Sequence, residues 1–286
     1  PPLSANGIIN LYRVEYRPIP NDPTLIFPVK SVTVEGTLTE TAISGLKPYS
    51  KHQARVVAIN NAGKVASDWV IGNTGQTSPE DLRAFKVEKI SDGTAVILRW
   101  DPPGLPNGLI NNYLIFEDGN LNPIYQGLTR EFEFRRLQPF TVYTVILEAC
   151  TLGGCSKTEK QNFTTAEVAP KDLSVPLLGS VNATHVVIIW GPPVNPNGKI
   201  LSYQIWRKNL ERIGKRDTTP GVLIHETRDT GKKQYQYVDS GLKPFSKYQY
   251  TIKGVNSKGA VESPGLTVET AQAAPTTVGS PLLSHI

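Results

Sequence analysis

An internal repeat constrains the fold of this chain more than any other feature. The stretch WDPPGLPNGLINNY at Trp100–Tyr113 returns ninety residues later as WGPPVNPNGKILSY at Trp190–Tyr203. A third copy, PPLSANGIINLY at Pro1–Tyr12, opens the chain and lacks the tryptophan. A period of about ninety residues indicates several copies of one structural unit, each long enough to bury its own core.

A second repeated block helps to place the boundaries of these units. It reads LKPYSKH at Leu46–His52, LQPFTVY at Leu137–Tyr143 and LKPFSKY at Leu242–Tyr248. The last two copies stand 105 residues apart instead of 91, and the extra residues fall between Arg207 and Lys233. We expect units at residues 1–76, 77–167 and 168–270, followed at 271–286 by a linker and the start of a further repeat.

Apolar side chains alternate with other residues in the stretches that lead to the repeated tryptophans. Val96 and Leu98 share a face with Trp100, and residues 185–190 repeat this arrangement up to Trp190. A period of two predicts β-strands, and no stretch shows the 3.6-residue period of a helix. We therefore expect an all-β chain in which each unit is a sandwich of two sheets.

The same periodicity gives the expected strands. In the first unit we expect four strands: Ile8–Arg17, Ser31–Glu40, Lys51–Asn60 and Val65–Asn73. The first two strands of this unit would lie before Pro1, and their absence would leave its sheets with an open edge. In the second unit we expect seven: Leu82–Ile90, Thr94–Trp100, Asn112–Glu117, Pro123–Gln126, Glu131–Leu137, Thr141–Cys150 and Cys155–Thr165.

The recurring residues have structural interpretations. The indoles of Trp100 and Trp190 are expected to meet the rings of Tyr113 and Tyr203, respectively, in the sandwich cores. The proline pair after each tryptophan ends its strand, and the Asn-Gly pair that follows supplies a turn with positive φ. The second block fits a tyrosine corner, in which a buried tyrosine hydroxyl bonds upstream backbone. Tyr143 and Tyr248 are its candidates, and His52 replaces the tyrosine in the first unit.

Together these motifs resemble the fibronectin type III repeat, over nearly the whole chain. The resemblance implies tandem immunoglobulin-like sandwiches of seven strands, the first one truncated at its N-terminus. It also implies a non-enzymatic structural and adhesive role in an extracellular protein. The segment ACTLGGCS at Ala149–Ser156 is further similar to repeats of one very large, membrane-anchored protein of sensory cells. That similarity implies a place at stereocilia and the photoreceptor ciliary region, with membrane anchoring outside this segment.

Cys150 and Cys155 are the two cysteines of the chain. They are expected at the two ends of the last hairpin of the second unit, where their Cα atoms are close enough for a disulfide. Two free thiols are the alternative. A zinc site would need two further ligands, and the chain has no second cysteine pair.

Two sequons, Asn162-Phe-Thr and Asn182-Ala-Thr, are candidate sites of N-glycosylation. Asn182 is expected in a turn before a strand, which suits a glycan. Asn162 is expected inside the last strand of its unit, where it must point outward to be used. The alternative for each sequon is a chance match.

One candidate partner surface lies in the third unit. By alternation Trp206 faces away from the core, as does Phe116 in the second unit. Such a ring either contacts a partner or packs under the adjacent hairpin. The following segment is basic, with candidate contacts at Arg207, Lys208, Arg212, Lys215 and Arg216. It would bind sulfated glycans or an acidic partner, or it is a solvated hairpin of mixed charge.

Charge and motif content exclude several function classes. The formal net charge of +5 is concentrated in residues 169–286, which hold 14 Lys and Arg against 8 Asp and Glu, so it is no chain-wide footprint for nucleic acid. The four histidines are scattered, and no catalytic triad, phosphate loop or calcium loop is present. We expect no enzyme and no cofactor. The expected partners are extracellular or matrix proteins and neighbouring repeats, and the rival interpretation is a ligand-binding segment of a cell-surface receptor or phosphatase.

Overall fold

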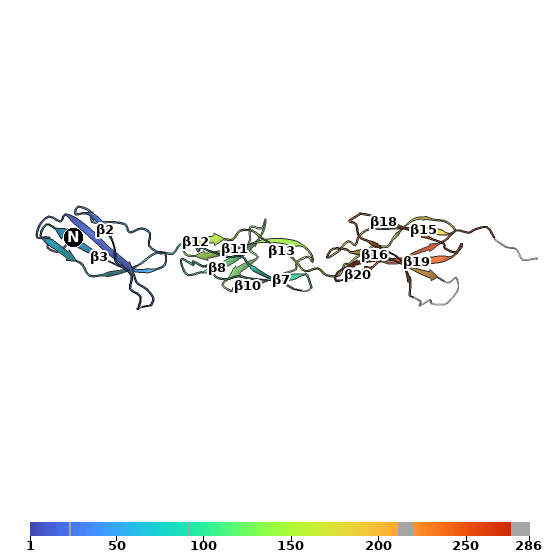
Figure 1. Ribbon diagram of the computed structural model, residues 1–286, viewed down its shortest axis with the longest axis horizontal. Helices are drawn as coiled ribbons and strands as arrows, with labels where there is room; N and C mark the ends of the chain where they lie inside the picture. Colours follow the sequence, from blue (N-terminus) through green and yellow to red (C-terminus); the bar gives the residue numbers. More distant parts are fainter. Residues whose placement is uncertain (23, 91, 211–219, 276–286) are drawn as a thin grey trace, which may run out of the picture. The chain divides into compact units, whose positions relative to one another are not determined.

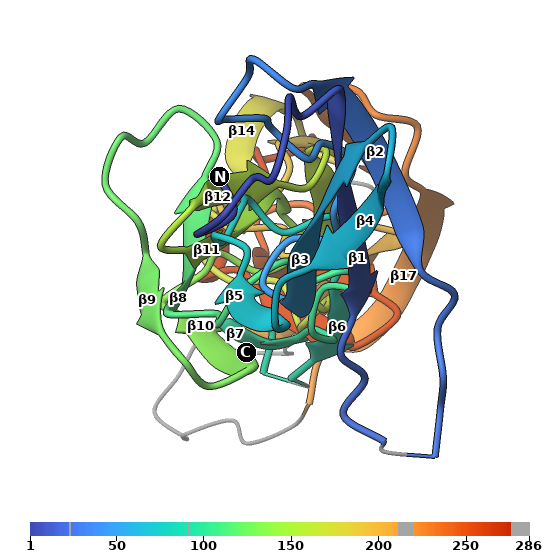
Figure 2. The same ribbon diagram turned by 90° about the vertical axis from the view of Figure 1, so that its left-hand side faces the viewer.

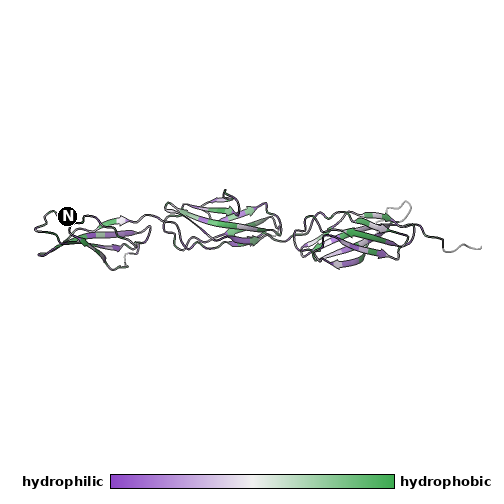
Figure 3. Cartoon of the chain, turned by 90° about the horizontal axis from the view of Figure 1, so that it is seen from above, coloured by the Kyte–Doolittle hydropathy of each residue, from purple (hydrophilic) through white to green (hydrophobic). Residues whose placement is uncertain are grey.

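The computed structural model describes residues 1–22, 24–90, 92–210 and 220–275 (Figure 1). The described residues form 21 strands and no helix, so the prediction of an all-β chain is confirmed. Accordingly, they contain no helix of the length and apolarity that a bilayer crossing requires. Hydrophobic and hydrophilic residues alternate along many of the strands (Figure 3), as a two-sided sheet demands.

The first repeat contains one five-stranded antiparallel sheet. Its strands are β1 (Leu11–Pro18), β2 (Lys30–Glu35), β3 (Lys51–Asn60), β4 (Gly63–Ala66) and β5 (Val70–Asn73). Strands β2, β1, β3 and β4 are hydrogen-bonded neighbours in this order, and β5 also pairs with β3. Figure 2 shows the strands of this sheet in blue and cyan.

The second repeat contains a three-stranded and a five-stranded sheet. The first has the order β10-β7-β6, and the second the order β12-β11-β8-β9, with β13 also paired to β11. The bounds are β6 (Lys86–Lys89), β7 (Ala95–Arg99), β8 (Asn112–Glu117), β9 (Tyr125–Gly127), β10 (Glu131–Arg135), β11 (Val142–Thr151), β12 (Gly154–Lys157) and β13 (Gln161–Thr164).

The third repeat has the same two sheets, in the orders β14-β15-β18 and β17-β16-β19-β20, with β21 paired to β19. The bounds are β14 (Leu177–Val181), β15 (His185–Trp190), β16 (Ser202–Leu210), β17 (Val222–Arg228), β18 (Tyr235–Ser240), β19 (Lys247–Asn256), β20 (Gly259–Glu262) and β21 (Leu266–Glu269). Most of the extra sequence predicted for this repeat, residues 211–219, lies outside the described residues.

The last strand of each repeat is interrupted, which the sequence did not predict. The expected strands Val65–Asn73 and Cys155–Thr165 are each two shorter strands, and β20 and β21 repeat the arrangement. At each break a hydroxyl residue replaces the strand pairing. The hydroxyl of Ser263 accepts the backbone N–H of Ile252 at 2.9 Å, while the Ser263 N–H donates to the Ile252 carbonyl at 2.8 Å. The ladder therefore continues through the break, and the strand changes course without losing hydrogen bonds.

Other strands are shorter than predicted at their ends. The structure has β6 in place of the expected strand Leu82–Ile90, β2 in place of Ser31–Glu40 and β10 in place of Glu131–Leu137. Arg136 ends β10 because its φ is 62°, a left-handed conformation that an extended strand does not contain.

The core of the third repeat lies between its two sheets. Ile188 and Trp190 of β15 belong to one cluster of buried side chains with Tyr203 of β16 and Ile252 of β19. Three of them are fully buried, and Trp190 is 3% exposed. Leu147 of β11, at the position of Ile252 in the second repeat, is also fully buried.

The corresponding face of the first repeat is open. Val56 of β3 stands at the position of Leu147 and Ile252, yet it is 41% exposed. A groove of about 750 Å³ runs over this face, with Val56, Val14 and Val34 in its lining. The face that is a core in the other repeats is thus an exposed apolar surface here.

Candidate functional site: the junctions between repeats

Each complete repeat is closed by an aromatic cluster around its tryptophan. The Trp100 ring centroid lies 5.7 Å from that of Tyr113 and 5.5 Å from that of Tyr125, both edge-on. The Trp190 centroid lies 6.0 Å from that of Tyr203 and 5.8 Å from that of Tyr235. Trp100 and Trp190 are each 3% exposed, so the repeated tryptophans pack inside their repeats.

The second repeated block forms a tight turn with the geometry of a tyrosine corner. In the third repeat the Tyr248 hydroxyl accepts the Lys243 backbone N–H at 3.0 Å. The aromatic residue after the proline has a φ of 48–50° in all three copies, at Tyr49, Phe140 and Phe245. The Tyr143 ring stacks on Phe163, with centroids 5.8 Å apart.

A threonine anchors the end of every repeat to this turn. The hydroxyl of Thr74 donates to the Lys47 carbonyl at 2.7 Å, that of Thr165 to the Gln138 carbonyl at 2.6 Å, and that of Thr270 to the Lys243 carbonyl at 2.7 Å. The residue after each threonine is held as well: the carbonyls of Gly75, Ala166 and Ala271 accept the backbone N–H of the turn aromatic at 2.9–3.1 Å.

At the first junction, the next residue is already bound to the following repeat. The Gln76 side-chain oxygen accepts the Leu109 backbone N–H at 3.0 Å, and the Thr77 N–H donates to the Asn107 carbonyl at 3.1 Å. From the β11–β12 hairpin, the Thr151 hydroxyl donates to the Thr77 carbonyl at 2.7 Å. The linker is therefore held from two loops of the second repeat.

The second junction repeats this arrangement with different side chains. The Glu167 carboxylate accepts the Lys199 backbone N–H at 3.0 Å and the Ser257 hydroxyl at 2.7 Å. The Asn256 amide of the β19–β20 hairpin donates to the Val168 carbonyl at 2.7 Å.

No residue separates the two attachments at either junction. Gly75 is bonded to the first repeat and Gln76 to the second, and Ala166 and Glu167 divide in the same way. The first attachment in each case is a backbone carbonyl, and the second is a side-chain oxygen of the adjacent residue.

The anchoring threonines and the strand-break hydroxyl residues recur at fixed spacings, which the sequence analysis did not detect. Thr74, Thr165 and Thr270 each stand 28 residues after the leucine that opens the second repeated block, and the strand-break hydroxyl residues stand 21 residues after it. Because both residue types are small and polar, they do not stand out in a hydrophobic pattern.

The family follows from the match of these repeats. The sequence model of the fibronectin type III domain matches residues 1–72 and 168–270, more than half of the chain. The chain belongs to the fibronectin type III family. The Trp190 core, the tyrosine corner of Tyr248 and the strand break at Ser263 all lie within the second of the matched segments.

This chain matches a small part of the length of the relatives it resembles. Usherin of Homo sapiens is 40% identical over 289 residues, which cover all of this chain and 6% of usherin. Usherin of Mus musculus is 38% identical with the same coverage. The phosphatidylinositol phosphatase PTPRQ of Homo sapiens is 28% identical over 197 residues, or 65% of this chain and 8% of the phosphatase. The tandem fibronectin type III repeats of this chain thus resemble usherin.

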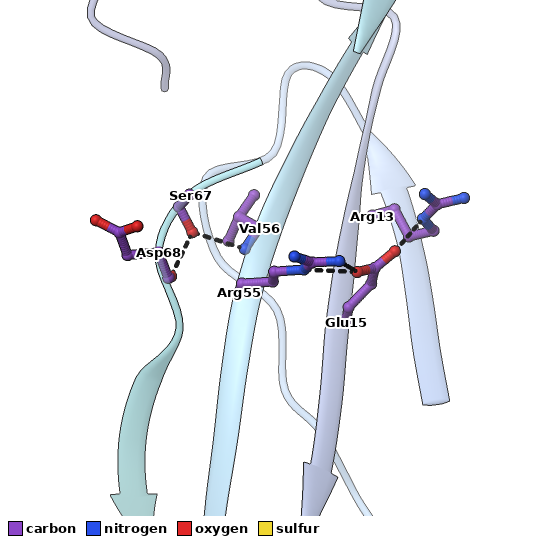
Figure 4. Close-up of polar contacts among 6 residues, drawn as sticks. All are labelled: Arg13, Glu15, Arg55, Val56, Ser67 and Asp68. Atoms are coloured by element: carbon purple, nitrogen blue, oxygen red, sulfur yellow. Dashed lines mark hydrogen bonds and ion pairs between the residues drawn. The ribbon is translucent and has the colours of Figure 1, made fainter. Parts of the chain in front are cut away.

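One face of the first sheet holds a charged cluster. Figure 4 shows the Glu15 carboxylate between Arg55, whose Nε and Nη2 lie 2.7 Å away, and Arg13, whose Nε lies 3.1 Å away. The hydrogen bond from Arg55 lowers the pKa of Glu15 below its ordinary value. Arg55 and Arg17 also lie over the ring of Trp69, at 4.6 and 5.2 Å from its centroid.

The same figure shows the strand break of the first repeat. The Ser67 hydroxyl accepts the Val56 backbone N–H at 3.1 Å and donates to the Asp68 carbonyl at 2.9 Å (Figure 4). This is the arrangement found at Ser263 in the third repeat.

Cys150 and Cys155 form a disulfide between directly opposed residues of β11 and β12, with Cα atoms 4.1 Å apart. Cys150 is 7% exposed, whereas Cys155 is exposed. Together with a Glu148 oxygen the two sulfur atoms lie within 4.8 Å of one another. As disulfide sulfurs they offer no thiolate to a metal ion.

Both sequon asparagines are exposed. Asn182 follows β14, and its side-chain oxygen accepts the backbone N–H groups of Thr184 and His185 at 2.9 and 2.7 Å. Asn162 lies in β13 and points away from the buried Phe163, and its side-chain oxygen accepts the Thr144 hydroxyl at 2.7 Å.

The structure brings together only part of the candidate partner surface. The Trp206 ring is half-buried, and the Lys253 ammonium lies 4.6 Å from its centroid. Phe116 has the same arrangement with Lys157, at 5.2 Å. Lys208 lies at the end of β16 and is half-buried. Arg212, Lys215 and Arg216 lie outside the described residues.

Arg207 faces inward from β16, which has a neighbouring strand on each side. Its guanidinium contacts both carboxylate oxygens of the buried Asp239, at 3.0 and 3.1 Å, and Tyr250 donates its hydroxyl to the same carboxylate at 2.8 Å. The Arg207 charge is therefore matched inside its own repeat. Burial raises the pKa of Tyr250 far above its ordinary value, and the bond to Asp239 raises it further.

Proposed function

We propose that this chain is a non-enzymatic structural and adhesive spacer of a large extracellular multi-domain protein that resembles usherin. Its repeats set the distance between sites elsewhere, and its contacts are with extracellular or matrix proteins and neighbouring repeats. The finer part of the proposal follows the similarity to usherin: a linkage role in sensory cells, at stereocilia and the photoreceptor ciliary region.

One observation carries the spacer role: consecutive residues at each junction are hydrogen-bonded to different repeats. A spacer keeps a fixed distance between its ends only if its junctions resist bending. A junction with no unbound residue has little conformational entropy to lose when it is fixed in one conformation. The stacked repeats of a solenoid depend on neighbour contacts in a comparable way.

The test compares the native first junction with a loosened one. Fluorophores at two exposed positions, Thr37→Cys and Glu159→Cys, report the distance distribution between the first two repeats. We expect a narrow distribution in the native chain and a broad one after insertion of a Gly-Ser segment between Gly75 and Gln76. Equal widths in both chains would refute the spacer role.

The extracellular setting has its own test. We expect peptide mapping without reductant to recover Cys150 linked to Cys155, and a glycan at Asn182 and at Asn162 when the chain is secreted from animal cells. Free thiols and unmodified sequons in the secreted chain would contradict this setting.

The rival role is a ligand-binding segment of a receptor or receptor phosphatase, and the similarity to the phosphatase PTPRQ favours it. In that role the basic segment binds sulfated glycans. Salt-dependent retention on heparin that disappears when Arg212, Lys215 and Arg216 are changed to Ser would support the rival. Arg207→Ser is unsuitable for this test because it leaves Asp239 unpaired.

A further inference from the structure

The two junctions use different means to hold the linker. At the second junction the β19–β20 hairpin makes two side-chain hydrogen bonds to the linker, from Asn256 to the Val168 carbonyl and from Ser257 to the Glu167 carboxylate. At the first junction the corresponding hairpin makes one, from Thr151 to the Thr77 carbonyl.

At the first junction the hairpin also approaches the linker closely. A Cβ on Gly153 would lie 2.2 Å from the Gln76 carbonyl oxygen, and one on Gly154 would lie 2.5 Å from the Ser78 hydroxyl. The tip of the β11–β12 hairpin therefore lies directly against the linker, and only glycine fits there. Lys258 stands at the position of Gly153 in the third repeat.

The hairpin that makes this contact is the one that carries the disulfide. Cys150 precedes Thr151, Cys155 follows Gly154, and the bond closes the four residues between them. In the third repeat the same opposed pair is Val255 and Ala260, which has no covalent link. The hairpin that makes one side-chain hydrogen bond to its linker, instead of two, is thus the cross-linked one.

We propose that the Cys150–Cys155 disulfide is a redox-sensitive lock on the first junction: it holds the hairpin tip against residues Gln76–Ser78, and its reduction frees the linker. A dithiol reductant supplies the two electrons. Its thiolate attacks the exposed Cys155 sulfur and displaces the Cys150 thiolate, and its second thiol then releases Cys155, which leaves two protein thiols and an oxidised dithiol. This inference rests on the proposed spacer function and adds control of one junction.

The physical effect is local. A cross-link across a short hairpin restricts the open conformations of that hairpin, and its loss lowers the free energy of local opening. The second junction has no disulfide and serves as an internal control in the same molecule.

The test measures amide hydrogen exchange by NMR in the intact chain, with and without dithiothreitol. The backbone N–H groups of Thr77 and Leu109 donate hydrogen bonds at the first junction, and those of Val168 and Lys199 donate at the second. On reduction we expect exchange at Thr77 and Leu109 to become about tenfold faster or more, and exchange at Val168 and Lys199 to stay within about twofold.

The double variant Cys150→Val with Cys155→Ala places the residues of the third repeat in this hairpin. We expect fast exchange at Thr77 and Leu109 with or without reductant, while the Leu147 amide inside the repeat stays protected. Unchanged exchange at the first junction on reduction overturns the lock but leaves the spacer standing. An equal change at Leu147 also overturns it, because the whole repeat would then be opening. Unprotected junction amides in the oxidised chain overturn both proposals.

Discussion

A single buried carboxylate, Asp239, joins both sheets of the third repeat. It lies in β18 and is 4% exposed, and it binds Arg207 of β16 and Tyr250 of β19. Removing one partner from a buried ion pair leaves the other charge uncompensated. The sequence analysis placed Arg207 on a partner surface because it opens a basic segment. The alternation that turns Trp206 outward turns Arg207 inward, but it does not show that Asp239 lies opposite.

The first prediction concerns this carboxylate. We expect Asp239→Ala to lower the free energy of unfolding of the third repeat by about 3 kcal/mol, since it leaves Arg207 and the Tyr250 hydroxyl without their acceptor. Chemical denaturation measures the change. The matched control is Asp101→Asn, which removes an exposed pair with Lys86 and is expected to cost under about 1 kcal/mol. Equal effects of the two changes would contradict this account.

The second prediction is a pH dependence from Tyr250. Burial raises the pKa of this tyrosine above the ordinary value of about 10, so the folded chain keeps a proton that the unfolded chain loses. Its contribution to stability is complete below about pH 10 and falls as the pH rises beyond it, by about 1.4 kcal/mol per pH unit. Denaturation between pH 9 and 12 should show a shallower decline for Tyr250→Phe than for the native chain. Parallel curves would show that Tyr250 does not titrate differently on folding.

At the scale of elements, the hairpins and linkers decide how repeats are joined. The β11–β12 and β19–β20 hairpins have the same two-residue turn and the same register, yet their tips contact the linkers through different groups. At one turn position, contact with the linker backbone requires Gly153 in the first hairpin, whereas Lys258 fits there in the second.

The third prediction follows from that contrast. We expect Gly153→Ala to lower the thermal midpoint of the second repeat, at a cost of about 1–3 kcal/mol, because the new methyl group meets the Gln76 carbonyl. Lys258→Ala, at the same turn position of the third repeat, should change stability by less than about 0.5 kcal/mol. Calorimetry of both variants checks the pair. A neutral Gly153→Ala would mean that the hairpin tip does not press on the linker.

The elements that sequence predicts well are those with strong hydrophobic alternation. The strands that contain Val96 and Ile188 and the aromatic clusters of Trp100 and Trp190 follow from period and repetition alone. The interrupted last strands do not, since a hydroxyl that substitutes for a ladder bond leaves the apolar pattern intact. The junction contacts are not predicted either, because they join a linker side chain to a backbone N–H group more than 30 residues later in the chain.

At the scale of the whole molecule, the second and third repeats each bury their own tryptophan. Stability should therefore divide by repeat. In the first repeat Val56 is 41% exposed, whereas the equivalent Leu147 and Ile252 of the other repeats are fully buried. The first repeat therefore gains the least stability from burial at this position.

The fourth prediction tests this division. We expect Trp190→Ala to destabilise the third repeat by about 3–5 kcal/mol, because it leaves a cavity beside Tyr203 and Tyr235. Amide exchange at Ile252 should become much faster, while exchange at Leu147 in the second repeat stays the same. A matching loss of protection at Leu147 would show one shared core instead of separate ones.

The central claim is that each linker is a fixed part of the repeat that follows it. Backbone order parameters of the amides of Gln76, Thr77, Glu167 and Val168, from ¹⁵N relaxation of the intact oxidised chain, test it most directly. We predict values of about 0.85, equal to those of the strands. Values below about 0.6 at these four amides would mean that the linkers move freely, and the clamped junction would be wrong.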